Sequence, residues 1–216
     1  MYLTRMFLNP ARRGTRQLLS SPQRMHAAVL GSFPPDSEVE TGGGRVLWRV
    51  DADPRAHTLL YISSPARPDL TAVVEQAGWP VSESTWQTAT LDRLLDRLAV
   101  GQQWRFRLTA NPVHNVAIPG QRGKRLGHVT VDQQEQWLTD RSSGWGFTTT
   151  SADVTSRRRL SFARRTDGTE RTVTVSVATF DGALEVTDVD ALKHSLGHGL
   201  GRAKAYGCGL LTLAPP

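Results

Sequence analysis

Residues 197–213, GHGLGRAKAYGCGLLTL, combine glycines with cations close to the end of the chain. Arg202 and Lys204 lie among five glycines, which are Gly197, Gly199, Gly201, Gly207 and Gly209. Glycine lets a backbone approach a ligand closely and turn through positive φ. Exposed backbone N–H groups beside Arg and Lys form anion sites. The pattern therefore predicts a phosphate-binding loop between the last helix and the last strand.

Nucleotide-cofactor motifs explain this segment less well. A P-loop has Lys and then Ser or Thr after its last glycine, whereas Arg202 and Ala203 follow Gly201. A dinucleotide-binding fingerprint needs a preceding strand and a βαβ unit after it, and here the chain is close to its end. An enzyme with a phosphate-containing cofactor stays an alternative that nucleotide binding in a calorimeter would support. We expect no small-molecule cofactor.

A second group of cations lies in residues 157–171, RRRLSFARRTDGTER, where six arginines face only two acidic residues. Leu160 and Phe162 alternate with the arginines, and Asp167-Gly168 predicts the turn of a β-hairpin. A charged hairpin face usually does no more than contact solvent. This density of arginine instead fits a two-stranded ribbon along a phosphate backbone. The predicted nucleic-acid contacts are Arg157, Arg158 and Arg159.

His26 is the candidate for acid–base chemistry. It lies in a helix predicted over residues 20–33, with Ser21 as the N-cap and Pro22 at the first helical position. The surrounding residues 1–35 contain five arginines and no acidic residue. A histidine with an ordinary pKa exchanges protons near neutral pH, although a lone helical histidine is more often structural.

The composition favours a nucleic-acid partner. The formal net charge is +6, and residues 99–216 contain 15 Lys and Arg against 10 Asp and Glu. Most of the cations are arginines, whose planar fork matches phosphate. Cys208 is the single cysteine, so neither an internal disulfide nor a cysteine-based metal site is expected. We expect no metal, no membrane segment and a cytoplasmic location.

The predicted elements follow one order in both halves of the chain. The first half gives a strand at 2–8, a helix at 20–33, strands at 45–51 and 57–63, a helix at 68–78 and a strand at 84–89. The second half gives a strand at 104–113, a basic loop at 119–128, a helix at 130–138, a hairpin at 157–180, a helix at 188–197 and a strand at 205–213. This order predicts an α+β fold of two tandem ferredoxin-like (RRM-like, βαββαβ) domains, residues 1–98 and 99–216.

The segments MYLTRMFLNP, PQRMHAAVLGSFP, FRLTANPV and GLGRAKAYGCGLLTLAP together resemble the CasE-type CRISPR-associated endoribonucleases of type I-E systems. The resemblance implies a protein that binds the stem-loop of a CRISPR repeat transcript and cuts it at the base of the stem without a metal. It further implies that the protein stays on the guide RNA with the other subunits of the Cascade complex. The resemblance makes His26 the catalytic histidine, residues 197–209 the glycine-rich loop and residues 157–171 the stem-binding hairpin.

One position departs from the family pattern. Well-known members have a tyrosine three residues before the histidine, where this sequence has Gln23. Glutamine donates and accepts hydrogen bonds but does not titrate, so we place Gln23 in the site as a helper of His26. Arg24, in the same acid-free segment, is predicted to bind RNA.

The implied chemistry needs no metal. The 2′-hydroxyl before the cut attacks the adjacent phosphate and leaves a 2′,3′-cyclic phosphate and a 5′-hydroxyl. His26 would act as base or acid, and Arg and Lys would stabilise the charged phosphorane. The sequence has no carboxylate cluster suited to Mg²⁺. The alternative, left open by Gln23, is a non-catalytic RNA-binding subunit that holds a processed guide hairpin.

Overall fold

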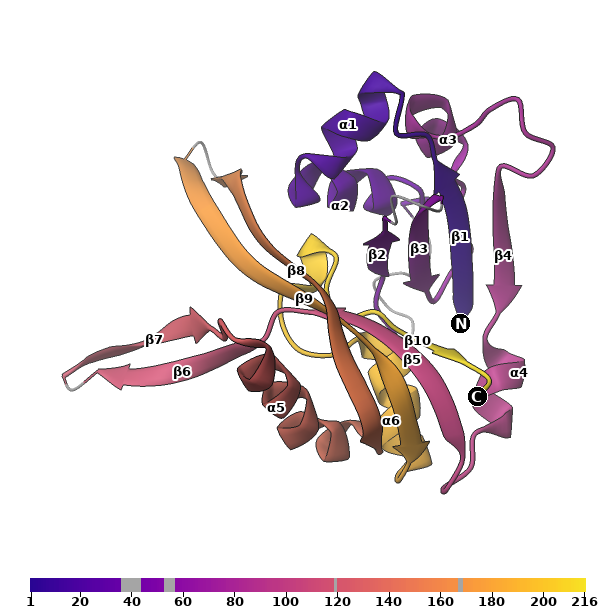
Figure 1. Cartoon of the computed structure of the whole chain (residues 1–216). Helices are drawn as coiled ribbons and strands as arrows, with labels where there is room; N and C mark the ends of the chain where they lie inside the picture. The colour runs from indigo at the N-terminus through magenta and orange to yellow at the C-terminus, as the bar shows by residue number, and fades with distance from the viewer. Residues whose placement is uncertain (36–43, 53–56, 119, 167–168) are drawn as a thin grey trace.

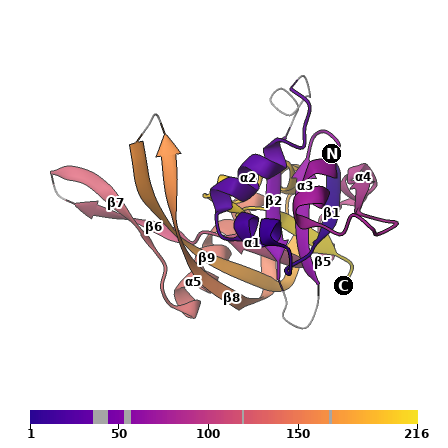
Figure 2. The ribbon, with the colours of Figure 1, turned by 90° about the horizontal axis from the view of Figure 1, so that it is seen from above.

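Two antiparallel four-stranded sheets organise the described part of the chain (Figure 1). The structure is a computed structural model that describes residues 1–35, 44–52, 57–118, 120–166 and 169–216. Among these residues, no helix has both the length and the apolar character that crossing a membrane requires. Figures 1 and 2 show a long hairpin reaching from the second sheet toward the helices of the first half, and a thin two-stranded arm projecting outward.

The first sheet has the strand order β2-β3-β1-β4. Its strands are β1 (Tyr2–Leu8), β2 (Leu47–Asp51), β3 (Thr58–Ser64) and β4 (Trp86–Thr90). Helices α1 (Arg13–Leu19) and α2 (Pro22–Leu30) lie between β1 and β2, and α3 (Thr71–Ala77) lies between β3 and β4. Met25 and Val29 of α2 pack with Met6, Leu60 and Ile62 of the sheet in one buried core, so burial of one stripe of α2 anchors the helix.

The second sheet has the order β10-β5-β9-β8. Its strands are β5 (Gln103–Ala110), β8 (Phe147–Thr166), β9 (Thr169–Val186) and β10 (Leu211–Ala214), and α4 (Asp92–Arg97) precedes them. Between the strands lie α5 (Val131–Ser142), the 3₁₀ turn η1 (Ser143–Trp145), α6 (Val189–His198) and the 3₁₀ turn η2 (Lys204–Tyr206). Counted within its own half, each sheet places its first strand between its third and fourth. The prediction of an α+β fold with two tandem ferredoxin-like units is confirmed.

A second core fills the space between this sheet and its helices. Trp137 and Leu138 of α5 and Leu192 of α6 pack against Phe180 and Leu184 of β9. Thr130 and Gln133 form a capping box at the start of α5, the helix that the sequence predicts over residues 130–138. The cap fixes where α5 begins, and the packing of Trp137 and Leu138 fixes which side of the helix faces the sheet.

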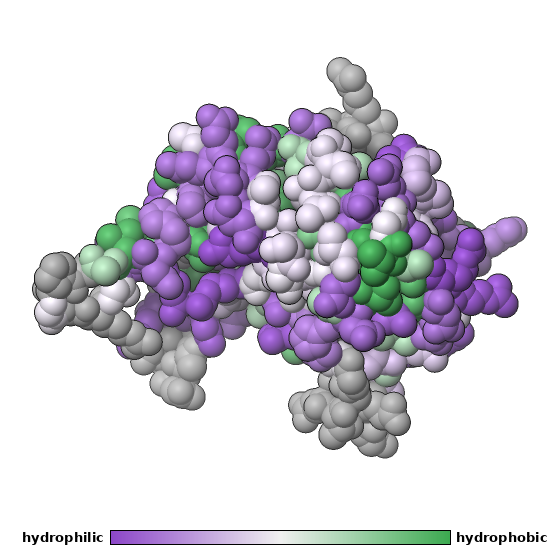
Figure 3. Space-filling model, turned by 90° about the horizontal axis from the view of Figure 1, so that it is seen from below, coloured by the Kyte–Doolittle hydropathy of each residue, from purple (hydrophilic) through white to green (hydrophobic). Residues whose placement is uncertain are grey.

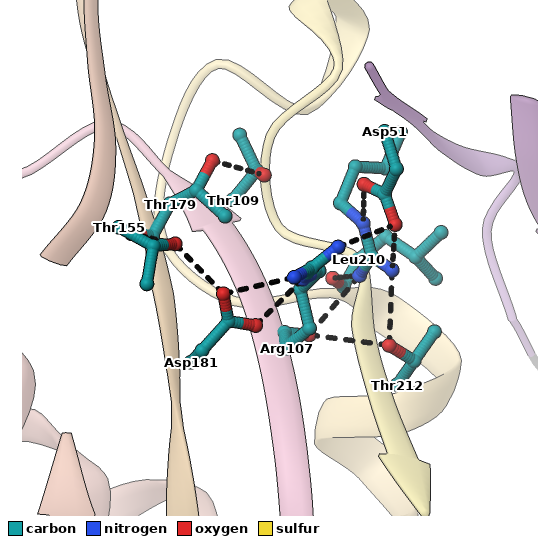
Figure 4. A network of polar contacts seen from close by, with 9 residues as sticks. Asp51, Arg107, Thr109, Thr155, Thr179, Asp181, Leu210 and Thr212 are labelled. Atoms are coloured by element: carbon teal, nitrogen blue, oxygen red, sulfur yellow. Dashed lines mark hydrogen bonds and ion pairs between the residues drawn. The ribbon is translucent and has the colours of Figure 1, made fainter. Parts of the chain in front are cut away.

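A polar network joins the two sheets (Figure 4). Arg49 of β2 is 2% exposed and donates to both carboxylate oxygens of Asp51, at 2.7 and 3.0 Å. Its remaining donors cross to the second half, to the carbonyl oxygens of Arg107 and Leu210 at 3.0 and 3.1 Å and to Thr212 Oγ1 at 3.0 Å. Figure 4 shows Arg107 between Asp51 and Asp181, bound to both carboxylates. Because each guanidinium N–H direction is fixed, this network sets how β2 lies against β5 and β10.

Residues 121–127 correct one prediction, because they form a strand and not part of the basic loop predicted over 119–128. Strands β6 (Val113–Ile118) and β7 (Gln121–Gly127) pair as a hairpin, the arm that projects in Figures 1 and 2. Gly120, at φ +72°, lies in the turn between them. The prediction failed because both faces of this arm carry polar residues, so the apolar alternation that usually identifies a strand is missing.

One further element and two boundaries also differ from the sequence predictions. Helix α1 was not expected, the long hairpin begins at Phe147 rather than at 157, and the last strand begins at Leu211 rather than at 205. Part of the predicted last strand is instead the turn η2, followed by glycines at positive φ. The predicted hairpin turn at Asp167-Gly168 lies outside the described residues.

Candidate functional site

Helix α2 places His26 at the edge of its buried stripe. The Ser21 side chain accepts a hydrogen bond from the Arg24 N–H, and Pro22 occupies the first turn, so the helix begins as predicted. Met25 is buried in the core and the next side chain, His26, is half-buried. A rotation of about 100° between successive residues therefore carries His26 from the core to the surface.

The His26 ring is held by a tryptophan of β2. Trp48 Nε1–H donates to His26 Nδ1 at 3.3 Å, and the Trp48 side chain is buried. Nδ1 must be unprotonated to accept this bond, so the neutral ring carries its proton on Nε2. Burial and the nearby Arg45 charge lower the pKa of His26 below its ordinary value of 6.5. His26 is therefore mainly neutral at pH 7 in the free protein.

Lys204 of η2 reaches the same region from the C-terminal end of the chain. Turn η2 packs against α2 and β2. Burial first, and the charge of Arg45 second, lower the pKa of Lys204, and the charge of Arg45 also acts on His26. The geometry thus brings three basic groups from separate segments to one place, where a phosphate anion would relieve their mutual repulsion.

The glycines of the C-terminal segment let it pack closely on β2. A Cβ on Gly207, at φ +80°, would lie 2.7 Å from the Trp48 ring, and a Cβ on Gly199, at φ +76°, would lie 2.7 Å from the Leu47 side chain. Gly197 is joined to the start of β2 by the Arg45 N–H, which donates to its carbonyl oxygen at 2.9 Å. Because these glycines have no side chain, the segment can contact Trp48 directly, and this contact fixes where Lys204 lies.

Several amides of this segment are already paired within the protein. The N–H groups of Gly199, Gly207 and Gly209 donate to the carbonyl oxygens of Ser195, Lys204 and Thr109. The expected row of exposed glycine N–H groups is therefore not formed at these three positions. That this segment binds phosphate stays a prediction, and its side chains, above all Lys204, carry it.

Arg202 points to a different place from Lys204. It is exposed and, with Gly201, lines a cavity of about 790 Å³ that also includes Trp137 and Arg141. His26 does not line this cavity. The sequence predicts both cations at one phosphate. In the structure Arg202 lies at this cavity, and Lys204 lies near His26 and Arg45.

Gln23 and Arg24 face the long hairpin across a cleft. A hollow of about 730 Å³ lies between the start of α2 and the outer part of β8 and β9, lined by Gln23, Arg24, Phe162 and neighbouring residues. Gln23 lies three residues before His26, so both side chains share one side of α2. Figures 1 and 2 show α2 beside the end of the hairpin. The predicted catalytic helix and the predicted RNA-binding hairpin therefore enclose one cleft.

The three hairpin arginines divide between two faces of β8. All three side chains are exposed. Arg157 donates to the carbonyl oxygen of Val129 at 3.2 Å, and the alternation of a strand places Arg159 on the same face. Arg158 shares its face with Phe162, which packs with Cys208. The charge of Arg158 acts on the Cys208 thiol, although complete burial raises the pKa of that thiol to about 12 and leaves it unreactive.

No sequence pattern indicated two members of this region, Trp48 and Arg45. Both lie in the segment predicted as a strand at 45–51, about twenty positions from His26. The only available signal was general: a buried tryptophan usually finds a hydrogen-bond acceptor for its N–H. Which acceptor it finds depends on how β2 and α2 pack.

We expect Trp48→Phe to raise the pKa of His26. The Trp48 N–H stabilises the neutral ring, because a protonated Nδ1 has no lone pair to accept it. Phenylalanine keeps most of the burial but removes this donor. The measurement is an NMR pH titration of the His26 ring, with the exposed His57 as internal control. A His26 midpoint equal to wild type would show that the Trp48 bond has no effect on ionisation.

Together, the tandem ferredoxin-like fold and a histidine set among arginine, lysine and a basic hairpin define an RNA-binding protein class. Residues 1–215 match the family described as CRISPR associated protein. The chain is also 30% identical over its full length, and over the full length of the relative, to the CRISPR-associated endoribonuclease Cse3 of Thermus thermophilus. The chain belongs to this CRISPR-associated family, in the CasE-type branch that the sequence resembles.

Other relatives agree with this assignment. The CRISPR system Cascade subunit CasE of Escherichia coli is 28% identical over 66% of this chain and 73% of its own length. The structure of Thermus thermophilus Cse3 bound to an RNA representing a pre-cleavage complex superposes with a TM-score of 0.77 at 28% identity, over 99% of this chain and 98% of that one. A chain of a CRISPR RNA-guided surveillance complex superposes with a TM-score of 0.68 at 27% identity, over the full length of both chains.

Proposed function

We propose that this protein is an endoribonuclease that cuts a CRISPR precursor transcript at the base of each repeat stem-loop. The convergence of His26, Arg45 and Lys204 carries the proposal. Gln23, on the same helix as His26, lines the cleft toward the basic hairpin. Relatives with this fold are named as an endoribonuclease and as a Cascade subunit. The first domain, residues 1–98, supplies the histidine, and the second, residues 99–216, supplies the hairpin and Lys204.

The reaction would be an attack by a 2′-hydroxyl on the adjacent phosphate. The bond from phosphorus to the 5′-oxygen breaks, which leaves a 2′,3′-cyclic phosphate and a 5′-hydroxyl. Arg45 and Lys204 would stabilise the added negative charge of the phosphorane. Because the nucleophile belongs to the RNA, the step requires no metal-activated water, and DNA, which lacks the 2′-hydroxyl, would not be cut.

His26 would exchange a proton through Nε2, the nitrogen that Trp48 leaves unengaged. As a base, Nε2 needs a free lone pair, so the proton of the neutral ring must be on Nδ1. As an acid, the ring must be protonated on both nitrogens. Either role puts a proton on Nδ1, so the Trp48 hydrogen bond seen in the free protein must open before or during the reaction. Gln23 would help by hydrogen bonding to RNA or to the ring, since it does not titrate.

The hairpin residues Arg157, Arg158 and Arg159 would contact the RNA stem, and Arg24 the strand near the cut. Their guanidinium groups are exposed and suited to phosphate oxygens. After cleavage the stem would stay on this surface. The protein would therefore remain on the guide RNA as a subunit of the Cascade complex, in the cytoplasm where the transcript is made.

Cleavage of a repeat hairpin in EDTA tests the proposal. Purified protein is expected to cut a radiolabelled repeat RNA at one position, equally fast with Mg²⁺ and with EDTA. The upstream product should carry a cyclic phosphate that acid opens. Binding without any cleavage would instead support a non-catalytic subunit that holds a processed guide, an alternative that Gln23 in place of tyrosine favours. If the protein neither binds nor cuts the repeat RNA, both functions are rejected.

A further inference from the structure

A second polar cavity lies outside the site around His26. It opens between β6, the end of α5, η1 and the glycine-rich segment, has a volume of about 790 Å³, and is lined by residues from all four. We call it the Arg141 pocket and define it by Asn111, His114, Asn115, Trp137, Arg141 and Arg202. Figures 1 and 2 show α5, which contributes Trp137 and Arg141 to the lining, beside the base of the projecting arm.

Two residues that line the Arg141 pocket carry buried polar atoms without hydrogen-bond partners among the described residues. Trp137 is 3% exposed, and its Nε1–H has no hydrogen-bond partner among the described residues. The same holds for the buried Oδ1 of Asn111. A buried donor or acceptor left unpaired costs about 1–3 kcal/mol. Both atoms are covered in this structure, and both belong to residues that line the cavity. A small shift of either side chain would therefore offer an unpaired donor or acceptor to a ligand.

The rim of the Arg141 pocket is cationic and planar. The Arg141 guanidinium lies over the Trp137 ring at 5.1 Å from its centroid. Its side chain is exposed, so the outer face of the guanidinium plane is available for stacking. Arg202 supplies a second exposed cation. The acidic member of the lining, Asp140, accepts a hydrogen bond from Gln136.

The surroundings extend this positive character. Residues 113–127 of the arm contain arginine and lysine but no Asp or Glu, and Lys124 and Arg125 are exposed. Gly127, at the base of the arm, lies close to Ser176 of β9, which pairs with Arg159. The face seen in Figure 3 is mostly hydrophilic, with small apolar patches. The cations of the arm, such as Lys124 and Arg125, favour a phosphate-bearing partner over an apolar protein surface.

We propose that the Arg141 pocket binds one unpaired nucleotide of the RNA strand that flanks the stem. Arg141 would stack on the base, Trp137 and Asn111 would bind its polar edge, and Arg202 would bind its phosphate. Arg202 and Lys204 are two residues apart, so at most about 7 Å separates their Cα atoms. A strand with one phosphate at Lys204 thus brings a neighbouring nucleotide to Arg202. The inference rests on the proposed RNA-cutting function, because that function places a phosphate at Lys204.

The test compares two RNAs that cannot be cut. One is a repeat hairpin that ends at the base of its stem, and the other carries four unpaired nucleotides on each side. Both have 2′-deoxy sugars in the terminal base pair of the stem, and the second also has them throughout its flanks. Fluorescence anisotropy gives the Kd of each. The wild type should bind the flanked RNA more tightly. Arg141→Ala should weaken binding of the flanked RNA about tenfold and leave the bare hairpin unchanged.

Two matched variants sharpen the result. Arg141→Lys keeps the charge but loses the stacking plane, so it should also lose most of the preference for the flanked RNA. Arg93→Ala removes an exposed arginine of α4 and should change neither Kd. Circular dichroism establishes that each variant is folded.

Three outcomes would overturn the inference. If Arg141→Ala weakens the binding of both RNAs equally, Arg141 contributes only a general electrostatic attraction. Unchanged binding of both RNAs, with loss of co-purification with the other Cascade subunits, would make the pocket a protein contact. If the wild type binds neither RNA, the proposed function itself fails and the inference with it.

Discussion

The His26→Ala variant is expected to cleave a repeat hairpin about 10²–10⁴-fold more slowly than the wild type. Its affinity for the hairpin should stay nearly unchanged, because a proton-transfer group contributes mainly in the transition state. The measurement is a single-turnover rate with protein in excess, together with the Kd for an RNA that has a 2′-deoxy sugar at the cut. The exposed His57 provides the control, since His57→Ala removes a histidine of the same domain that does not belong to the group of His26, Arg45 and Lys204.

Gln23→Tyr tests the departure from the family pattern in the same assay. If Gln23 occupies a helper position beside His26, tyrosine should keep or raise the rate. Cleavage by His26→Ala at the wild-type rate would remove His26 from the mechanism. Lys204 and the arginines would then be the residues to examine for the catalytic group.

The Arg49→Met variant is expected to lose about 3–5 kcal/mol of unfolding free energy. Arg49 is buried and gives hydrogen bonds to Asp51 and to the backbone of Arg107 and Leu210. Methionine fills a similar volume but leaves these acceptors unpaired inside the protein. The substitution weakens the contact between the two sheets in particular, because the acceptors other than Asp51 belong to the second half of the chain.

Urea unfolding followed by fluorescence and by circular dichroism measures this loss. Arg93→Met, at an exposed position of α4, should change the unfolding free energy by no more than about 0.5 kcal/mol. A loss of stability for Arg49→Met as small as that of the control would show that the network is not needed to hold the sheets together. Asp51 keeps its ion pair with Arg107, at 3.4 Å, so the expected loss lies toward the lower end of the range.

The sequence alone was sufficient for the fold class and for the start of α2. Alternation in residues 2–8 and the Ser21-Pro22 pair are local signals, and they correspond to β1 and to the N-terminus of α2. The capping box at Thr130 is of the same kind. Local rules succeed here because each depends on neighbours within a few positions along the chain.

The choice of His26 also came from the sequence, through its basic surroundings and the family resemblance. Its role stays a prediction, but its environment could only come from tertiary structure. Trp48 meets His26 because β2 packs beside α2, and Lys204 reaches the same place because the last glycines let η2 lie against Trp48. Nothing in the spacing of these residues along the chain indicates that contact.

Tertiary structure likewise decided what the polar segments became. Residues 121–127 pair with β6 in the arm although they lack an apolar face, and Arg202 lines the same cavity as Arg141, whereas Lys204 does not. Composition identifies such residues as cations that could bind phosphate. Their direction depends on backbone pairing and on positive-φ turns such as the one at Gly201, which are settled by long-range packing. The sequence thus determined which chemical groups are available, and the fold determined which of them share a site.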